Sequence, residues 1–480
     1  MLQSVYDPQT ERRTAWFGWA WLSALYLAGI FLWGKFLNWG TIPFDFHDWA
    51  EITAPRVAFL RDAVIKGVLP LHMPDASALR GITDRFMSLP DMLLSPQILL
   101  MRFMEVGPFI LVNTLIFYTL GVIGLLVLRR RFSLSLASFS VLFFLFNFNG
   151  HILGHYSVGH VTWAGYFLFP WLAELTFQLL DGDHSWGWVA KTSLLLFFMY
   201  LQGSYHQFIW SVLFLGLLAI TTWKHFLPVF KTLVFSILLS MVRILPPVLL
   251  LSQFDDEFLG GYPTLWDVLQ SLVVVKFPNE ALDVRSMLSV LGWWEYDLYL
   301  GLAGAAFLFY FGLYRWLKHR NEPLGYPQLL LPIFGIFLLS IGRIYRIVRL
   351  LPIPILSGER ASIRMIILPV FFLLVLGAVE LQKWLKEQPK PPSIPLQISG
   401  LGLLLLLVHD LWQHFKAWQV TNAVMAFPVT PVDLSIKVVA NHPDPPYIAL
   451  ISAGAAISLA SLVVLLFLAW RERRQRPGHA

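Results

Sequence analysis

The run PFILVNTLIFYTLGVIGLLVL at residues 108–128, followed at once by Arg129, Arg130 and Arg131, decides the fold of this chain. A helix needs about 20 consecutive apolar residues to cross the hydrocarbon core of a bilayer, and this run supplies them without a charged residue. Arginines that flank a span tend to stay on its cytoplasmic side. The run therefore predicts a transmembrane helix whose C-terminal end faces the cytoplasm.

Comparable runs recur along the whole chain. Its 480 residues are 57% apolar and 13% charged, and its mean hydropathy is +0.64, far above that of a soluble domain. The other candidate spans are 15–37, 133–149, 161–180, 189–203, 205–222, 231–251, 298–316, 328–343, 365–385, 397–412 and 447–470. We predict an all-α polytopic integral membrane protein of about 12 transmembrane helices, forming a single membrane domain over residues 1–480.

Short basic connections on one side of these spans set the predicted orientation. With the N-terminus inside, the cytoplasmic connections are 129–131, 181–191, 222–231, 315–327, 382–395 and the C-terminal 471–476. The net charge of +6 then reflects orientation and contact with anionic membrane lipids, not nucleic-acid binding. We predict a multi-pass protein of the inner (plasma) membrane with both termini cytoplasmic, and leave its oligomeric state open. The absence of cysteine excludes disulfides and thiolate chemistry.

The long connections fall on the opposite, non-cytoplasmic side, where loops held by a rigid scaffold carry most functional sites. They are 38–107, 150–160, 252–297, 343–364 and 413–447. In the first outer loop, 38–107, residues 48–68 mix apolar and charged side chains, a pattern that favours an amphipathic helix in the membrane interface.

Two acidic residues lie just beyond the first span, in the stretch FDFHDW at 44–49. Asp48 or Asp45 could serve as a general base that draws a proton from an acceptor hydroxyl at the membrane surface. Alternatively, either carboxylate caps the helix that follows, by accepting bonds from free backbone N–H groups. The sequence leaves both readings open.

Three histidines alternate with glycines in NGHILGHYSVGH at 149–160. We expect His151, His155 and His160 to line a tight polar loop able to hold a phosphate, a sugar hydroxyl or a metal. The spacing is not that of a standard zinc site. The alternative is a loop whose histidines only form hydrogen bonds at the interface.

Several arginines lie in another of the outer loops, 343–364. Arg343, Arg346, Arg349, Arg360 and Arg364 lie on the side where the orientation rule disfavours positive charge. A phosphate bound by guanidinium groups would compensate them; anionic lipid headgroups are the alternative.

One further arginine, Arg243, lies inside a predicted span beside Pro246 and Pro247. An ionisable residue within a span is a functional candidate. It could equally be a structural partner of Glu174, which also lies within a span.

The stretch GVLPLHMP at 67–74, then Leu89-Pro90 and Ser95-Pro96, resembles the proline pattern of bacterial GT-C superfamily membrane glycosyltransferases, especially the YfhO-like group. Asp48 after the first span, the glycine-and-histidine stretch and the spacing of Arg360 and Arg364 agree with that group. Two features depart from it: His72 stands where tryptophan is usual, and the C-terminal part lacks a sizeable outer domain.

The resemblance implies an enzyme that transfers a sugar from a polyprenyl-phosphate-linked donor to an acceptor on the non-cytoplasmic face, with inversion. Asp48 would then be the base, with Asp45 as second candidate. The donor phosphate would be held by arginines and the substrates positioned by histidines. The arginines are Arg360, Arg364, Arg243 and Arg346, and the histidines are His47, His151, His155 and His160. Neither the residues nor the resemblance fixes a cofactor or metal ligand, and a divalent ion, Mg²⁺ or Mn²⁺, stays open.

Two other classes of function remain. A transporter or flippase for a lipid-linked substrate tends to place charges and broken helices near the membrane midplane, often in two related halves. A non-catalytic scaffold subunit would keep the spans and loops without the reaction.

Overall fold

The computed structural model describes residues 5–8, 15–45, 47–73, 84–89, 91–253, 259–278, 292–351, 353, 356, 358–388, 393–423 and 444–475. Parts of the outer loops 38–107, 252–297, 343–364 and 413–447 lie outside these ranges, as do Pro74 and Pro90. Throughout the described ranges the chain forms helices and turns, with isolated bridges but no strand. The all-α prediction is confirmed.

Seven helical stretches are long and apolar enough to cross a membrane. Four of them are single helices: α3 (Ala15–Phe36), α5 (Val106–Phe132), α21 (Ile394–Trp418) and α23 (Pro445–Gln475). The other three are composite: α6 (Leu136–Asn147) with α7 (Gly150–Ser157); α14 (Trp293–Tyr296), α15 (Gly301–Phe307), the π-helical η9 (Leu308–Arg315) and α16 (Trp316–His319); and η11 (Ser362–Ile366) with α20 (Ile367–Glu387).

The number of candidate spans rises to eight if one bent pair of helices is counted as a single span. α11 (Trp223–Leu239) and the stretch Met241–Leu249, which begins with α12 (Met241–Ile244), meet at 55°. Shorter apolar helices are α9 (Trp186–Leu201), α10 (Tyr205–Thr221) and Pro327–Leu339, the last made of η10 (Pro327–Leu329) and α17 (Leu330–Leu339). A helical membrane protein is thus confirmed, whereas the count of twelve spans stays a prediction.

The remaining helices are short. They are η1 (Asn38–Gly40), η2 (Trp49–Thr53), α4 (Ala54–Lys66), η4 (Phe86–Ser88), η5 (Pro96–Arg102), η6 (Val161–Leu168), α8 (Phe169–Leu180), η7 (Pro246–Gln253), α13 (Leu265–Val273), α18 (Arg346–Arg349) and α22 (Val420–Ala423).

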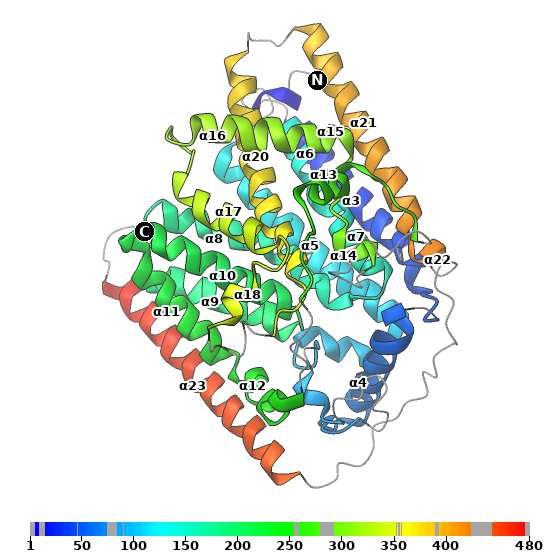
Figure 1. Ribbon diagram of the computed structural model, residues 1–480, viewed down its shortest axis with the longest axis vertical. Helices are drawn as coiled ribbons and strands as arrows, with labels where there is room; N and C mark the ends of the chain where they lie inside the picture. The colour runs from blue at the N-terminus through cyan, green and yellow to red at the C-terminus, as the bar shows by residue number, and fades with distance from the viewer. Residues whose placement is uncertain are drawn as a thin grey trace.

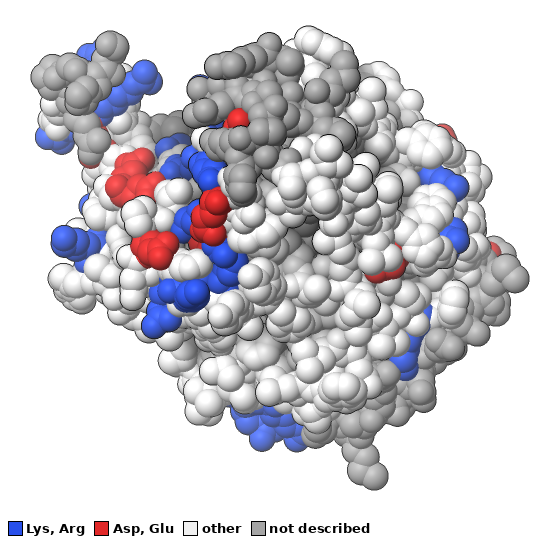
Figure 2. Space-filling model, turned by 90° about the horizontal axis from the view of Figure 1, so that it is seen from above, with Lys and Arg blue, Asp and Glu red and all other residues white. Residues whose placement is uncertain are grey.

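The spans divide into a buried centre and an exposed outside. α20 is almost wholly enclosed, whereas large apolar side chains are exposed along α3, α21 and α23. Figure 1 shows α21 and α23 running along the outside of the bundle. Figure 2 shows a face that is largely uncharged, with most of its Lys, Arg, Asp and Glu side chains gathered in one part. Exposed apolar helices around a packed centre suit a bundle surrounded by lipid.

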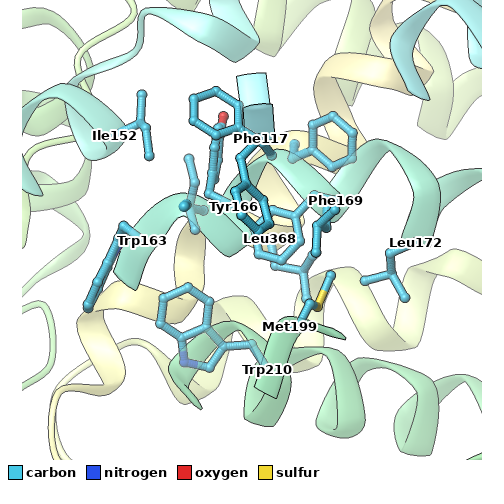
Figure 3. Close-up of a cluster of buried hydrophobic side chains, with 14 of the residues drawn as sticks. Phe117, Ile152, Trp163, Tyr166, Phe169, Leu172, Met199, Trp210 and Leu368 are labelled. Carbon is cyan, nitrogen blue, oxygen red and sulfur yellow. The ribbon is translucent and has the colours of Figure 1, made fainter. Parts of the chain in front are cut away.

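Aromatic and aliphatic side chains from many helices fill the centre. Figure 3 shows Phe117 of α5, Phe169 and Leu172 of α8, and Leu368 of α20 among them, and all four are buried. Phe371 of α20 lies 5.1 Å from Phe146 of α6, ring centre to ring centre. This packed core gives the polar residues above it a rigid base.

Segments predicted to share a membrane face contact one another. Arg131 lies 2.6 Å from Asp181, and the Tyr326 hydroxyl donates to the same carboxylate. On the other predicted face, Arg85 binds Asp444 at 2.9 Å. The structure therefore gathers each set of predicted loops at its own end, while which end faces the cytoplasm stays a prediction from the charge rule.

A helix, α4, forms within the predicted interfacial segment 48–68, but its apolar side faces protein. Phe59 and Leu60 are buried, and Phe59 packs edge-on against Phe86. Ile65 at its C-terminal end is exposed. The amphipathic pattern thus reflects packing against the first outer loop and η5 as well as any contact with the bilayer.

Candidate functional site

Charged and imidazole side chains from five separate parts of the chain meet near the outer ends of the helices. We call this group the polar cluster; it consists of Asp48, His155, His160, His206, Glu295, Glu359 and Arg364. The residues come from the first outer loop, α7 and its C-terminal turn, α10, α14, and the segment that leads into η11. Together they hold three carboxylates and one guanidinium group, all in positions largely removed from solvent.

The stretch 149–160 is not the loop that the sequence predicted. Residues 150–157 form α7, because the Asn149 side chain caps the helix by accepting a hydrogen bond from the Ile152 N–H. Gly150 and Gly154 allow close packing against Asp297 and Trp294 and do not make turns. The expectation of a loop failed because it rested on the glycines among the histidines, whereas Asn149 provides a helix N-cap.

Gly150 offers a test of this packing. An added Cβ would lie 1.8 Å from Asp297 Oδ1 and 2.4 Å from the Tyr299 backbone nitrogen, so Gly150→Ala is expected to destabilise the protein by about 1–3 kcal/mol. Gly216 in α10 has nothing within 4 Å of its would-be Cβ, and Gly216→Ala should be neutral or stabilising by up to ~1 kcal/mol. Thermal unfolding in detergent compares the two, and equal melting temperatures would contradict the packing.

Asp48 does not cap the helix that follows it. Asp48 occupies the capping position of η2, yet its side chain makes no capping hydrogen bond. Its Oδ2 instead lies 2.8 Å from Nε2 of His160. The capping alternative is therefore wrong for Asp48, whose carboxylate belongs to the polar cluster.

The histidines continue from this carboxylate into the protein. His160 Nδ1 lies 2.7 Å from His155 Nδ1, and the two rings stack. His155 is fully buried, and its Nε2 lies 4.0 Å from Glu295 Oε2. Hydrogen bonds thus join Asp48, His160 and His155, and Glu295 lies beyond them without a hydrogen bond to His155.

Arg364 is linked to two glutamates: it binds Glu295 directly and is connected to Glu359 through His206. Glu295 accepts two hydrogen bonds from Arg364, from Nε and Nη2. The third nitrogen of Arg364, Nη1, lies 3.1 Å from His206 Nε2, and His206 Nδ1 lies 2.8 Å from Glu359 Oε2. Glu359 also accepts from the indole N–H of Trp210 at 2.9 Å. Bidentate contacts between charged groups fix orientation as well as charge.

Two tryptophans separate the polar cluster from the apolar core. The ring of Trp163 stacks on His155 at 4.2 Å and lies 5.1 Å from the Arg364 guanidinium. Its indole N–H donates to His151, so Trp163 links His151 to the polar cluster. Figure 3 shows Trp163 and Trp210 at the edge of the apolar cluster around Tyr166. These rings exclude water from one side and so strengthen the electrostatic interactions of the charged groups.

The Glu359 carboxyl is held ionised by its neighbours. Burial by itself would raise its pKa, but His206, Arg364 and Trp210 outweigh burial and keep the pKa below the ordinary value of 4.5. A depressed carboxyl pKa contributes stability above the unfolded-state pKa, and that stability is lost as the pH falls through the folded-state pKa.

We therefore expect wild type to lose its stability advantage over Glu359→Gln as the pH falls from about 5 to about 3. Melting temperatures measured across this range check the prediction. Glu322→Gln, on an exposed turn, serves as the control and should keep a constant offset. An offset for Glu359→Gln that stays constant in acid would contradict the role assigned to His206 and Arg364.

The four arginines predicted to bind a donor phosphate are not brought together. Arg364 lies inside the polar cluster, whereas Arg346 in α18 and Arg360 are exposed. Arg243 is buried and donates from Nη2 to the backbone oxygen of Leu89. Its suggested partner Glu174 is bound instead by Arg131, at 2.7 Å. Pairing of Arg243 with Glu174 is therefore wrong.

The remaining predicted residues lie beside Asp48. His47 packs edge-on against Trp294 at 4.6 Å, and its Nδ1 lies 3.6 Å from Asp48 Oδ1. Burial is the main reason that the His47 pKa lies below its ordinary value, although Asp48 opposes this shift. Asp45 has a buried Oδ1 without a hydrogen-bond partner.

Three members of the polar cluster were missed by the sequence analysis: His206, Glu295 and Glu359. Glu295 sits in the aromatic stretch WWEY. Glu359 directly precedes Arg360. Of the three, only Glu295 has a tryptophan beside it in the sequence, and a charged group beside tryptophan near a span end is too frequent in membrane proteins to be selective.

Part of the polar cluster has the composition of a metal site. His155, His160 and Glu295 each present a donor atom, and the three atoms lie within 4.8 Å of one another. Two imidazoles and a carboxylate suit zinc better than Mg²⁺ or Mn²⁺, which prefer oxygen ligands.

Comparisons with protein-family models, with curated proteins and with solved structures found no match. The function must therefore be argued from the site.

Proposed function

We propose that the protein is a GT-C-type membrane glycosyltransferase of the YfhO-like kind, in which Asp48 is the general base. The observation that supports the proposal most is the position of Asp48: its carboxylate makes no capping bond and lies against His160 at the edge of the polar cluster. A carboxylate that a histidine holds in a fixed position is suited to accept a proton from a bound hydroxyl.

The proposed reaction transfers a sugar from a polyprenyl-phosphate-linked donor to an acceptor hydroxyl on the non-cytoplasmic face. The acceptor oxygen forms a bond to the anomeric carbon, and the bond from that carbon to the phosphate oxygen breaks, leaving its electron pair on the phosphate. The hydroxyl proton passes to Asp48, and the configuration at the anomeric carbon inverts. Positive charge near the leaving phosphate lowers the barrier.

Arg364 and Arg360 would each supply positive charge near the leaving phosphate, in different ways. All three nitrogen positions of Arg364 are engaged by Glu295 and His206, so Arg364 would act through its charge and not by direct contact. Arg360, four residues earlier and exposed, would contact the donor phosphate. The donor's lipid tail would stay in the bilayer beside the exposed apolar helices.

One observation favours a second function, a flippase or transporter of a lipid-linked anion. The span formed by α11 and Met241–Leu249 is broken by 55°, and Arg243 lies just beyond the break with Nε and Nη1 buried and unpaired. Broken helices with a buried charge occur at transporter binding sites. A scaffold subunit would show neither activity.

Purified protein in liposomes distinguishes these functions. A panel of radiolabelled polyprenyl-phosphate sugars is supplied with membrane acceptors, and both sugar transfer and movement of the donor between leaflets are measured. Transfer supports the glycosyltransferase. Movement without transfer supports the flippase, and the absence of both across the panel would leave the scaffold.

A further inference from the structure

One imidazole nitrogen in the polar cluster has no partner. His155 is fully buried, and while its Nδ1 meets His160 at 2.7 Å, its Nε2 has no hydrogen-bond partner. The Oε2 atom of Glu295 lies 4.0 Å from that nitrogen. A buried polar atom without a hydrogen bond is costly, so the site favours a bound species of suitable chemistry.

The order of protons along the histidines defines what that species must be. An ionised carboxylate only accepts hydrogen bonds, so His160 Nε2–H donates to Asp48 Oδ2. Neutral His160 then offers a lone pair at Nδ1, which accepts from the Nδ1–H of His155. His155 is left with a lone pair at Nε2, directed toward the carboxylate of Glu295. Two electron-rich groups face each other, and a cation between them would bind both.

The geometry points to a site for a divalent transition-metal ion, of which Zn²⁺ is the type, held by His155, His160 and Glu295. Zinc lies about 2.0–2.1 Å from imidazole nitrogen and about 2.0–2.2 Å from carboxylate oxygen. In a tetrahedral site two such donors lie about 3.4 Å apart, so the 4.0 Å between His155 Nε2 and Glu295 Oε2 would have to shorten by about half an ångström. The three donor atoms lie within 4.8 Å of one another. Because His160 Nδ1 accepts from the His155 Nδ1–H, binding of an ion must break that hydrogen bond before side-chain rotations can close the shell.

The second layer around these ligands also fits a metal site. Histidine ligands usually donate their other ring N–H to a carboxylate, which fixes the ring and raises its basicity. His160 makes this contact with Asp48 at 2.8 Å. A carboxylate oxygen has more than one lone pair, so Glu295 could bind an ion through Oε2 and keep Arg364 on both oxygens.

Metal binding does not depend on glycosyl transfer. Only the role of the ion rests on the proposed function: beside Asp48 it would add positive charge where the donor phosphate leaves.

The test measures bound metal directly. Protein purified in detergent is treated with chelator and dialysed against Zn²⁺, Mn²⁺ or Mg²⁺, and metal content is determined by mass spectrometry. We expect about one Zn²⁺ per chain and little Mg²⁺. Cobalt substitution should give the visible absorption bands of a tetrahedral site. Zinc affinity should fall by about tenfold or more in His155→Gln and Glu295→Gln, and by about 10- to 100-fold in Asp48→Asn, which alters only the outer contact.

His184→Gln is the matched control. His184 also faces another histidine, at 3.2 Å from His225, but on the predicted cytoplasmic side, and its variant should bind zinc like wild type. His155→Gln serves even if Glu295→Gln does not fold. Absence of stoichiometric Zn²⁺ in wild type, or equal zinc affinity in wild type and His155→Gln, would overturn the proposal. Zinc binding without sugar transfer would support the metal site while removing the transferase.

Discussion

Asp48→Asn is expected to reduce sugar transfer by about 100- to 10,000-fold, the range that general-base catalysis contributes. Asparagine keeps the size of aspartate and can still form a hydrogen bond with His160, but it cannot take up the acceptor proton. Initial rates of transfer from a radiolabelled polyprenyl-phosphate sugar, at matched protein levels in liposomes, measure the effect. The loss should appear in kcat, because donor binding relies on other groups.

Glu51→Gln provides the matched control for this variant. Glu51 lies three positions further along the same segment and is exposed, so its substitution should leave the rate within about twofold of wild type. Retention of full activity in Asp48→Asn would place the base elsewhere, and Asp45, with its buried unpaired oxygen, would be tested next.

Glu295→Gln is expected to destabilise the protein by about 3–5 kcal/mol. The substitution removes the negative charge that the two Glu295 oxygens present to Arg364. The Arg364 guanidinium is largely buried, so its positive charge is left without a bidentate partner. Urea or thermal unfolding in detergent, followed by tryptophan fluorescence, measures the loss. The effect should exceed that of any single exposed carboxylate.

A double-mutant cycle separates the ion pair from the space that Glu295 fills. Replacing both partners, in Glu295→Gln with Arg364→Met, removes the uncompensated charge, so the double variant should be more stable than the sum of the single changes predicts. Strictly additive losses would mean that Glu295 and Arg364 act independently, contrary to the bidentate contact.

Several parts of the site could be predicted from sequence because each carries a local signal. Asp48 follows directly after an apolar run, the histidines recur within twelve residues, and Arg364 stands among arginines on the disfavoured side. Such patterns select residues one segment at a time. They singled out Asp48, His155, His160 and Arg364, although nothing in them showed that these four residues meet.

The errors arose where one residue pattern fits two structures. Glycines among polar residues fit a turn or a helix; here the Asn149 cap starts the helix, and Gly150 packs closely against Asp297 and Tyr299. Glu174 and Arg243 looked like partners because both lie in spans. In the folded protein Glu174 is bound by Arg131, which lies in the last turn of α5.

The amino-acid sequence by itself determined that this protein is a helical membrane protein, because the free energy of burying apolar runs in lipid is a sum over neighbouring residues and can be read from any window of the chain. Only the tertiary structure decided that Asp48, Glu295 and Glu359 share one buried site with Arg364 and three histidines. Their contacts join residues more than a hundred positions apart, and such pairing depends on how the helices pack, which no local pattern encodes.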